Sequence, residues 1–398
     1  MTTEELSGHG GTGEMEPREI AVELDIDGRS VGVEREDTEA IREPFDPEKI
    51  DVVTRNPTVD LLLSRVKRNV LDLQPEFQRL AGIWSPRRQS RLIESMLLRI
   101  PLPTFYAAES ISADDRWVIV DGVQRLTTIA RFVTPDSIGM GRLVLTDLEY
   151  LKDYEGKGFD GLPGRLQTRL LETEVVLHLI RRGTPEEVMF NIFARINTGG
   201  RPLTPQELRH ALIPGRAREL LRDLAQSPEY QDATLRSVSP ARMNDREMVL
   251  RFIAFRFTEP ADYVRGDFDG FLRDAMRRVN RLDQDQVRRL RQDFIRAVGA
   301  ARQIFGEYAF RKRYPGDSRR NPINKALFET VSVNLARRSE SELRVLCGRG
   351  ELVQEKLSKL LSESVEFEGS ISAGTGDIAK VRTRFEEIDK IFKDVANA

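Results

Sequence analysis

Residues 117–125 read Trp117-Val118-Ile119-Val120-Asp121-Gly122-Val123-Gln124-Arg125, and this stretch decides how we expect the chain to fold. Its first four residues are an apolar run rich in β-branched side chains, which predicts a buried strand. Beyond it, Leu126, Ile129 and Val133 recur at helical spacing, which predicts a helix that starts inside or directly after Asp121–Arg125. We therefore expect a strand, a tight turn and a helix in immediate succession.

The chemistry of this junction suits an anion. The first backbone N–H groups of a helix lack partners and lie at the positive end of its dipole. Arg125 adds a guanidinium that matches a phosphate through two parallel hydrogen bonds. Gln124 adds a neutral donor and acceptor, and Asp121 a carboxylate that caps the helix or holds a metal ion. The same residues also fit a purely structural junction, with Asp121 as an N-cap, Gly122 as a turn residue and Arg125 on a solvated helix face.

Composition narrows the class of protein. The chain has 398 residues, 32% charged and 39% hydrophobic, which is typical of a soluble protein with more than one domain. No apolar run has the length of a membrane span, and the acidic N-terminal segment lacks the pattern of a signal peptide. Cys347 is the only cysteine and the three histidines lie far apart in the sequence, which argues against disulfides, zinc clusters and a His-rich nuclease centre. We expect a cytoplasmic protein.

Charge is divided unevenly along the chain. Residues 1–50 carry 15 acidic and 5 basic side chains, which predicts a flexible acidic N-terminal arm. Residues 209–320 carry 24 Lys and Arg against 16 Asp and Glu. This excess fits a nucleic-acid-binding face, or it fits ordinary solvated helix surfaces. The opposite charges also suggest that the arm folds back on the basic body.

Patterns elsewhere predict an α+β part followed by helices. Strands are expected at 71–79, 104–108, 142–145 and 174–180, and helices at 58–70, 85–100 and 184–196. From residue 204 to the end nearly every segment has helical periodicity. We therefore expect three units: an arm over 1–50, an α+β domain over 51–210 and a helical domain over 211–398.

A set of ordered motifs resembles the GmrSD-type restriction-endonuclease N-terminal domain family, whose core is ParB/sulfiredoxin-like. The family's Asp-Gly-Gln-Gln-Arg-Leu-Thr-Thr signature is similar to Asp121–Thr128, and its Phe-x-Arg-Ile-Asn-Thr-Gly-Gly motif is similar to Phe193–Gly200. Further similar segments are Gln74–Arg79, Trp84-Ser85, Leu92–Ser95, Ile100–Pro103, Leu203-Thr204 and Glu207–Arg209. The resemblance covers roughly residues 60–335, and the combination of motifs is far more specific than any one of them.

The resemblance implies a module of prokaryotic DNA-directed defence that binds and hydrolyses a nucleoside triphosphate, GTP or ATP, with Mg²⁺. It implies Asp121, Gln124 and Arg125 as catalytic residues, with Asp121 also as a metal ligand. Contacts to the nucleotide are implied for Gln78, Arg79, Gly122, Thr127, Arg195 and Asn197. The turn at Asn197–Gly200 also fits a simple helix C-terminus.

Two departures from the family pattern bear on activity. Val123 stands where the family commonly has glutamine, so hydrolysis is weak or absent if that glutamine is catalytic, unless the side chain at 123 simply faces the core. The sequence also shows no His-rich nuclease domain. We therefore expect no DNA cleavage by this chain alone, with DNA and a separate HNH-type nuclease subunit as partners. The alternative is a non-catalytic ParB-like DNA-binding or regulatory protein, whose DNA affinity falls steeply with salt.

Overall fold

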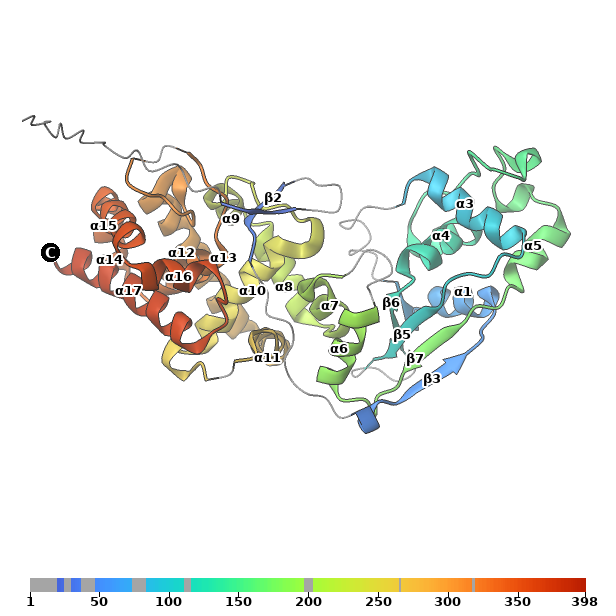
Figure 1. Cartoon of the computed structure of the whole chain (residues 1–398), viewed down its shortest axis with the longest axis horizontal. Coiled ribbons are helices and arrows are strands. Elements are labelled where there is room, and N and C mark those ends of the chain that lie inside the picture. The colour runs from blue at the N-terminus through green and yellow to red at the C-terminus, as the bar shows by residue number, and fades with distance from the viewer. Residues whose placement is uncertain are drawn as a thin grey trace, which may run out of the picture.

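The computed structural model describes residues 20–24, 30–36, 47–73, 84–110, 116–196, 203–264, 266–316 and 319–398. These residues form an elongated molecule with an α+β lobe and a helical lobe (Figure 1). The fold class is therefore α+β with a helical C-terminal region, as the sequence predicts. The ParB/sulfiredoxin-like core stays a prediction. Among the described helices, none is both long and apolar enough to cross a membrane.

A mixed five-stranded sheet forms the centre of the α+β lobe. In spatial order its strands are β3 (Val52–Arg55), β7 (Leu177–Ile180), β5 (Phe105–Glu109), β6 (Trp117–Asp121) and β4 (Leu71–Asp72). The pairs β3–β7 and β5–β6 are antiparallel, whereas β5–β7 and β4–β6 are parallel. The strands expected at 71–79, 104–108, 117–120 and 174–180 overlap β4, β5, β6 and β7, although residues 74–79 lie outside the described residues. Residues 142–145 form no strand, so that expectation is wrong.

Helices cover both faces of this sheet. One face packs on α1 (Val59–Lys67), α3 (Pro86–Leu97), α4 (Val123–Val133) and α5 (Gly164–Leu171), and the other on α6 (Glu186–Ile196) and α7 (Pro205–Leu212). Within β6, Trp117 and Ile119 belong to the first core, whereas Val118 and Val120 belong to the second. Burial on both faces explains why β6 is a continuous apolar run. The second core continues into the helical lobe, so α6 and α7 join the two lobes (Figure 1).

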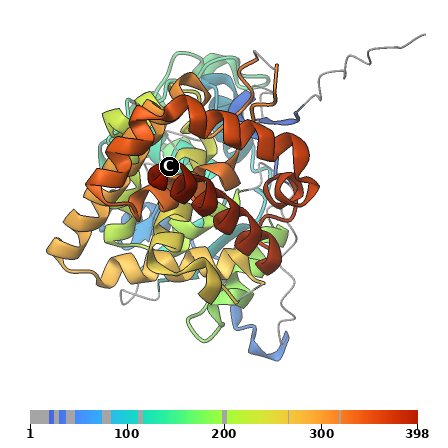
Figure 2. The same cartoon turned by 90° about the vertical axis from the view of Figure 1, so that its left-hand side faces the viewer.

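The helical lobe is built around two fully embedded helices. Its helices are α8 (Arg216–Ala225), α9 (Pro228–Ala233), α10 (Asn244–Phe257), α11 (Phe268–Arg281), α12 (Gln284–Phe305), α13 (Lys325–Ala336), α14 (Glu340–Gly348), α15 (Gly350–Glu363), α16 (Val365–Ser372) and α17 (Ile378–Asn397). Every residue of α13 is buried, and α10 is buried over nearly its whole length. The last helices, in orange and red, cover the end of this lobe that lies away from the sheet (Figure 2).

Part of the N-terminal arm is folded. Strands β1 (Val22–Leu24) and β2 (Ser30–Glu34) form an antiparallel hairpin on the helical lobe. The backbone of β2 is bonded on both sides, with Ser239 N donating to Val31 O at 3.0 Å and Glu34 N donating to Ile323 O at 2.8 Å. Val31 and Val33 are buried. The sequence predicts a flexible arm over residues 1–50, but the described residues 30–36 are an integral part of the helical lobe.

Candidate functional site

The junction between β6 and α4 has the expected strand–turn–helix order. Gly122 is the N-cap of α4, with φ at +90°, and no side chain among the described residues caps the helix. Asp121 therefore does not fill the N-cap role that the sequence suggested for it. A Cβ on Gly122 would lie 2.4 Å from Cδ1 of Phe105, so both the backbone angle and the packing require glycine. Within the described part of the chain, the first N–H groups of α4 therefore have no side-chain partner, which suits an anion.

Arg125 lies inside this junction rather than on its surface. Its guanidinium donates to Asp121 Oδ2 at 2.9 Å, to Thr104 O at 3.2 Å and to Pro103 O. It also lies 4.6 Å from the ring centroid of Phe105, and its side chain is 11% exposed. Burial lowers the pKa of Arg125, although the Asp121 carboxylate acts in the opposite direction. The guanidinium thus ties the segment before β5 to the start of α4.

Gln124 lies beside Trp84, two residues before the start of α3. Its Oε1 accepts from Trp84 N at 3.4 Å, and Gln89 Nε2 donates to Trp84 O at 2.9 Å. The guanidinium of Arg88 lies over the Trp84 ring, 4.2 Å from its centroid. The Gln124 side chain is half-buried. The start of α3 and the start of α4 are therefore joined through Trp84.

Val123 and Thr127 both point into the protein. Val123 is 8% exposed and belongs to the apolar core between the sheet and α1, α3, α4 and α5. Thr127 is 1% exposed, and its hydroxyl donates to Val123 O at 2.7 Å. The residue that departs from the family signature therefore faces the core, and the Thr127 hydroxyl is used within the helix.

The side chains of the other expected site residues are not described by the structure. Gln78, Arg79 and Asn197 lie outside the described residues, and the side chain of Arg195 is not described. Their flanking elements do surround β6: β4, which precedes residues 74–83, is its parallel neighbour, and α6 and α7 both contact it. Since parallel strands end at the same edge of a sheet, β4 ends beside the start of α4.

Residues 59–214 match the family model described as the GmrSD restriction endonuclease, N-terminal domain. This segment is similar to that family and is named the GmrSD-type domain. The GmrSD-type domain runs from the first residue of α1 to just beyond α7, and it includes the β6–α4 junction. The description of that family is of a restriction endonuclease. Neither the curated proteins nor the solved structures contain a match to the chain.

Several motif residues of the GmrSD-type domain have structural partners. Glu207 forms a capping box with Thr204 at the start of α7. Arg209 is buried and pairs with Asp269 and, at 3.4 Å, with Glu247 of the helical lobe. The buried carboxylate of Glu94 accepts from the backbone N–H groups of residues 149–151, at 2.7–2.9 Å. These parts of the family pattern are explained by folding.

Asp121 is the carboxylate that the junction offers to a metal ion. Within the described ranges, no group of three or more His, Cys, Asp or Glu side chains is placed to hold a metal. Asp121 is about one-third exposed, and its Oδ2 is bonded to Arg125. Mg²⁺ is commonly held by one or two carboxylates together with substrate phosphates. A single, partly exposed carboxylate is compatible with such a complex, and the metal role of Asp121 stays a prediction.

The arginine-rich surface of residues 209–320 is largely neutralised within the chain. Arginines from α8, α10, α11 and α12 form ion pairs with nearby aspartates. These pairs are Arg222–Asp223, Arg256–Asp293, Arg273–Asp267, Arg291–Asp223 and Arg302–Asp232. Such pairing is what ordinary helix surfaces require, so these arginines need no nucleic acid to explain them.

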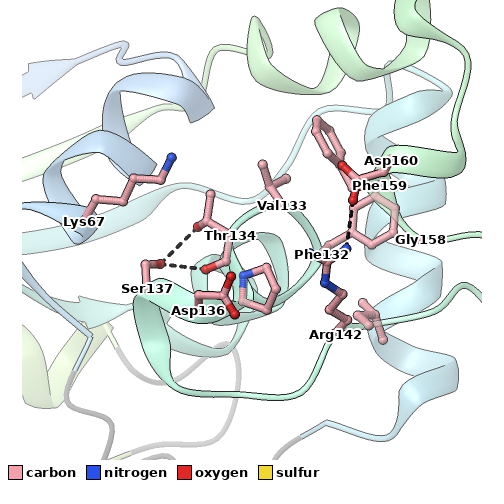
Figure 3. A pocket seen from close by; sticks show the side chains of 12 residues that line it. Lys67, Phe132, Val133, Thr134, Asp136, Ser137, Arg142, Gly158, Phe159 and Asp160 are labelled. Atoms are coloured by element: carbon pink, nitrogen blue, oxygen red, sulfur yellow. Dashed lines mark hydrogen bonds and ion pairs between the residues drawn. The ribbon is translucent and has the colours of Figure 1, made fainter.

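A cavity of about 280 Å³ lies at the other end of α4 (Figure 3). None of the expected site residues that the structure describes lines it. Sequence patterns also did not single out Phe105, although its ring lies beneath Arg125 and against Gly122. The sequence indicated only that Phe105 lies in an expected strand. The partners of Phe105 lie about 17 to 20 positions further along the chain, where no local pattern reveals them.

Proposed function

We propose that the GmrSD-type domain binds a nucleoside triphosphate at the β6–α4 junction and hydrolyses it, within a DNA-directed restriction-like system. The observation that carries this proposal is the uncapped N-terminus of α4 directly after Gly122. Backbone N–H groups at such a terminus, together with the helix dipole, favour phosphate oxygens. Because Gly122 has no side chain, a phosphate is able to approach the backbone closely.

Asp121 decides which form of the nucleotide fits. A free triphosphate would be repelled by this carboxylate, which lies one residue before the N-cap. The repulsion becomes attraction if the nucleotide carries Mg²⁺, the usual form in phosphoryl transfer. In this proposal Asp121 binds the metal–nucleotide complex, and the Gln124 amide orients a water molecule or a phosphate oxygen.

Arg125 acts in this proposal as a positioning residue. Its bonds to Asp121 and to the carbonyls of Pro103 and Thr104 hold the carboxylate in place. Contacts from Gln78, Arg79, Thr127, Arg195 and Asn197 stay predictions. Since the Val123 side chain belongs to the core, its difference from glutamine takes no group away from the junction surface. We therefore expect hydrolysis, and not binding alone.

The test is phosphate release from GTP and ATP by the full-length chain with Mg²⁺, together with titration calorimetry of nucleotide binding. Gln124→Ala should lower the rate about 10- to 100-fold with little change in Tm, because it removes one orienting group. Gln284→Ala, at an exposed position on α12, is the matched control and should keep the wild-type rate. Arg125→Ala is less informative, because it also removes three hydrogen bonds from the fold.

The outcomes separate the parts of the proposal. No binding and no release with any nucleotide, with or without DNA, would contradict a nucleotide site. Binding without release would leave a nucleotide-binding sensor. Because we assign DNA cleavage to a separate HNH-type nuclease subunit, the chain alone should leave plasmid DNA intact. The alternative of a non-catalytic DNA-binding protein draws no specific support from the paired arginines of the helical lobe.

A further inference from the structure

The cavity at the far end of α4 has walls from four separate segments. They are Lys67 at the end of α1, residues 132–137 at the end of α4 and in the following 3₁₀ turn, residues 142–143, and residues 158–160 (Figure 3). Its volume of about 280 Å³ lies just below the ~300–1,000 Å³ of ordinary small-molecule sites, so its ligand is small.

One side of the cavity is aromatic. Phe132 and Phe159 meet edge to face, with centroids 5.9 Å apart and an interplanar angle of 85°. Phe132 is buried, whereas Phe159 is half-buried and borders the cavity. An aromatic ring with an accessible face favours a flat, unsaturated ligand.

The remaining lining offers hydrogen bonds and balanced charge. Thr134 Oγ1 and Ser137 Oγ lie 3.1 Å apart, and Ser137 Oγ donates to Thr134 O at 2.7 Å. The last carbonyl groups of α4 are partly used within the fold, since Ala130 O accepts from Thr134 N at 2.7 Å and Arg131 O accepts from Leu143 N at 3.4 Å. Two cations and two carboxylates line the cavity: Lys67, Arg142, Asp136 and Asp160, and Arg142 pairs with Asp160 at 2.8 Å. Their formal charges cancel, which favours a ligand that is neutral and carries both donors and acceptors.

We propose that this cavity binds a single nucleobase, carried by a free nucleoside or by an unpaired nucleotide of a strand. A nucleobase is planar, neutral and small, and it has donors and acceptors at its edge. It stacks on aromatic side chains without regard to sequence. If the base belongs to a strand, Lys67 and Arg142, which line the cavity, are the cations that the neighbouring phosphates would contact.

This site is independent of the proposed triphosphate site. The two lie at opposite ends of α4, an 11-residue helix that spans roughly 15 Å. A variant in one is therefore not expected to disturb the other directly.

Gly158 provides a sharp test, because it lines the cavity and has an ordinary φ of −86°. A Cβ there would meet only Leu143 O, at 3.8 Å. Gly158→Val should therefore fill part of the cavity without strain. The control is Gly141→Val, at a glycine that is not among the lining residues and whose Cβ would meet nothing within 4 Å. The probes are 2-aminopurine riboside and a single-stranded oligonucleotide with one 2-aminopurine, followed by fluorescence on the full-length chain.

We expect Gly158→Val to weaken binding of the base about 5-fold or more, the range that loss of one stacked base produces, with Tm unchanged. Phe159→Leu should weaken it similarly, and Gly141→Val should not. Binding of the riboside identifies free nucleosides as a source, whereas binding of the oligonucleotide alone identifies a strand. Equal binding by wild type and Gly158→Val, equal binding of an abasic oligonucleotide, or no binding of either probe would overturn the proposal.

Discussion

At the scale of single residues, Gly122 has the clearest structural requirement. Its φ of +90° is costly for other residues, and a Cβ would press on the Phe105 ring. Gly122→Ala should lower the free energy of unfolding by roughly 2–4 kcal/mol, from strain and overpacking together. Gly139→Ala, where φ is +60° but no atom lies within 4 Å, should cost about 1 kcal/mol. Urea unfolding measures both, and equal losses would contradict the close contact with Phe105.

The core-facing side chain at position 123 gives a second residue-scale prediction. Val123→Gln restores the glutamine of the family signature, but it places an amide in an apolar core. We expect a loss of about 1–3 kcal/mol in stability and no gain in nucleotide turnover. Thermal unfolding and phosphate release test this pair of outcomes. A variant that turns over faster than wild type would show that the side chain at 123 reaches the nucleotide.

Arg125 shows which properties of a residue local sequence patterns predict and which they do not. Its residue type and position after a strand correctly indicate a junction of special geometry, and they suggest a phosphate contact. They do not reveal that Pro103 and Thr104 bind the guanidinium, because these partners lie about 20 residues earlier in the chain, directly before the neighbouring strand β5. Local sequence gives the chemistry of a side chain, whereas its partners depend on the tertiary fold.

At the scale of elements, the capping signals at Ser85 and Thr204 are confirmed, whereas the N-cap role suggested for Asp121 is wrong because Gly122 occupies that position. Ser85 caps α3 with Pro86 in its first turn, and Thr204 forms the capping box of α7. The short strands β1, β2 and β3 were not predicted, because a few residues give too little periodicity. Residues 142–145 alternate like a strand but pair with none. The difference lies in long-range pairing, which the local pattern does not contain.

The hairpin of β1 and β2 gives the prediction at this scale. Glu34 accepts from Lys312 Nζ at 2.7 Å and from Asn324 Nδ2 at 2.8 Å, and the Lys312 side chain is 3% exposed. Glu34→Ala would leave this buried ammonium with Glu368, 3.6 Å away, as its remaining carboxylate. We expect a loss of about 3 kcal/mol. Asp160→Ala breaks the exposed pair with Arg142 and should cost under about 1 kcal/mol.

Equilibrium unfolding of Glu34→Ala and Asp160→Ala tests whether the hairpin is part of the folded helical lobe. If Glu34→Ala costs no more than Asp160→Ala, the hairpin is not part of the folded lobe, and residues 20–36 behave as the flexible arm that composition predicts.

At the scale of the whole molecule, the acidic N-terminal segment is partly explained by the buried cations of the helical lobe. Glu23 pairs with Lys325 at 3.2 Å, and Glu36 pairs with Arg251. Arg251 also contacts Glu247, at 3.0 Å, within the same buried network. The charge asymmetry seen in the sequence therefore reflects, in part, pairing between distant segments of one chain. Composition revealed that opposite charges exist, but not that they meet inside a core.

The order of α+β and helical parts was predictable, because a change in periodicity marks it. The sequence did not predict that helices cover both faces of the sheet. It also did not predict the continuous core that joins the lobes through α6 and α7. Which strands become neighbours depends on crossovers, and these have no local signal.

The most direct test of the central claim is hydrogen–deuterium exchange of the full-length chain with and without Mg²⁺ and a non-hydrolysable triphosphate analogue. If phosphates bind the N–H groups at the start of α4, amides of residues 122–126 should exchange more slowly with the analogue, whereas those of residues 131–137 at the opposite end should not change. Unchanged exchange at residues 122–126, under conditions in which calorimetry shows the analogue to be bound, would contradict the account.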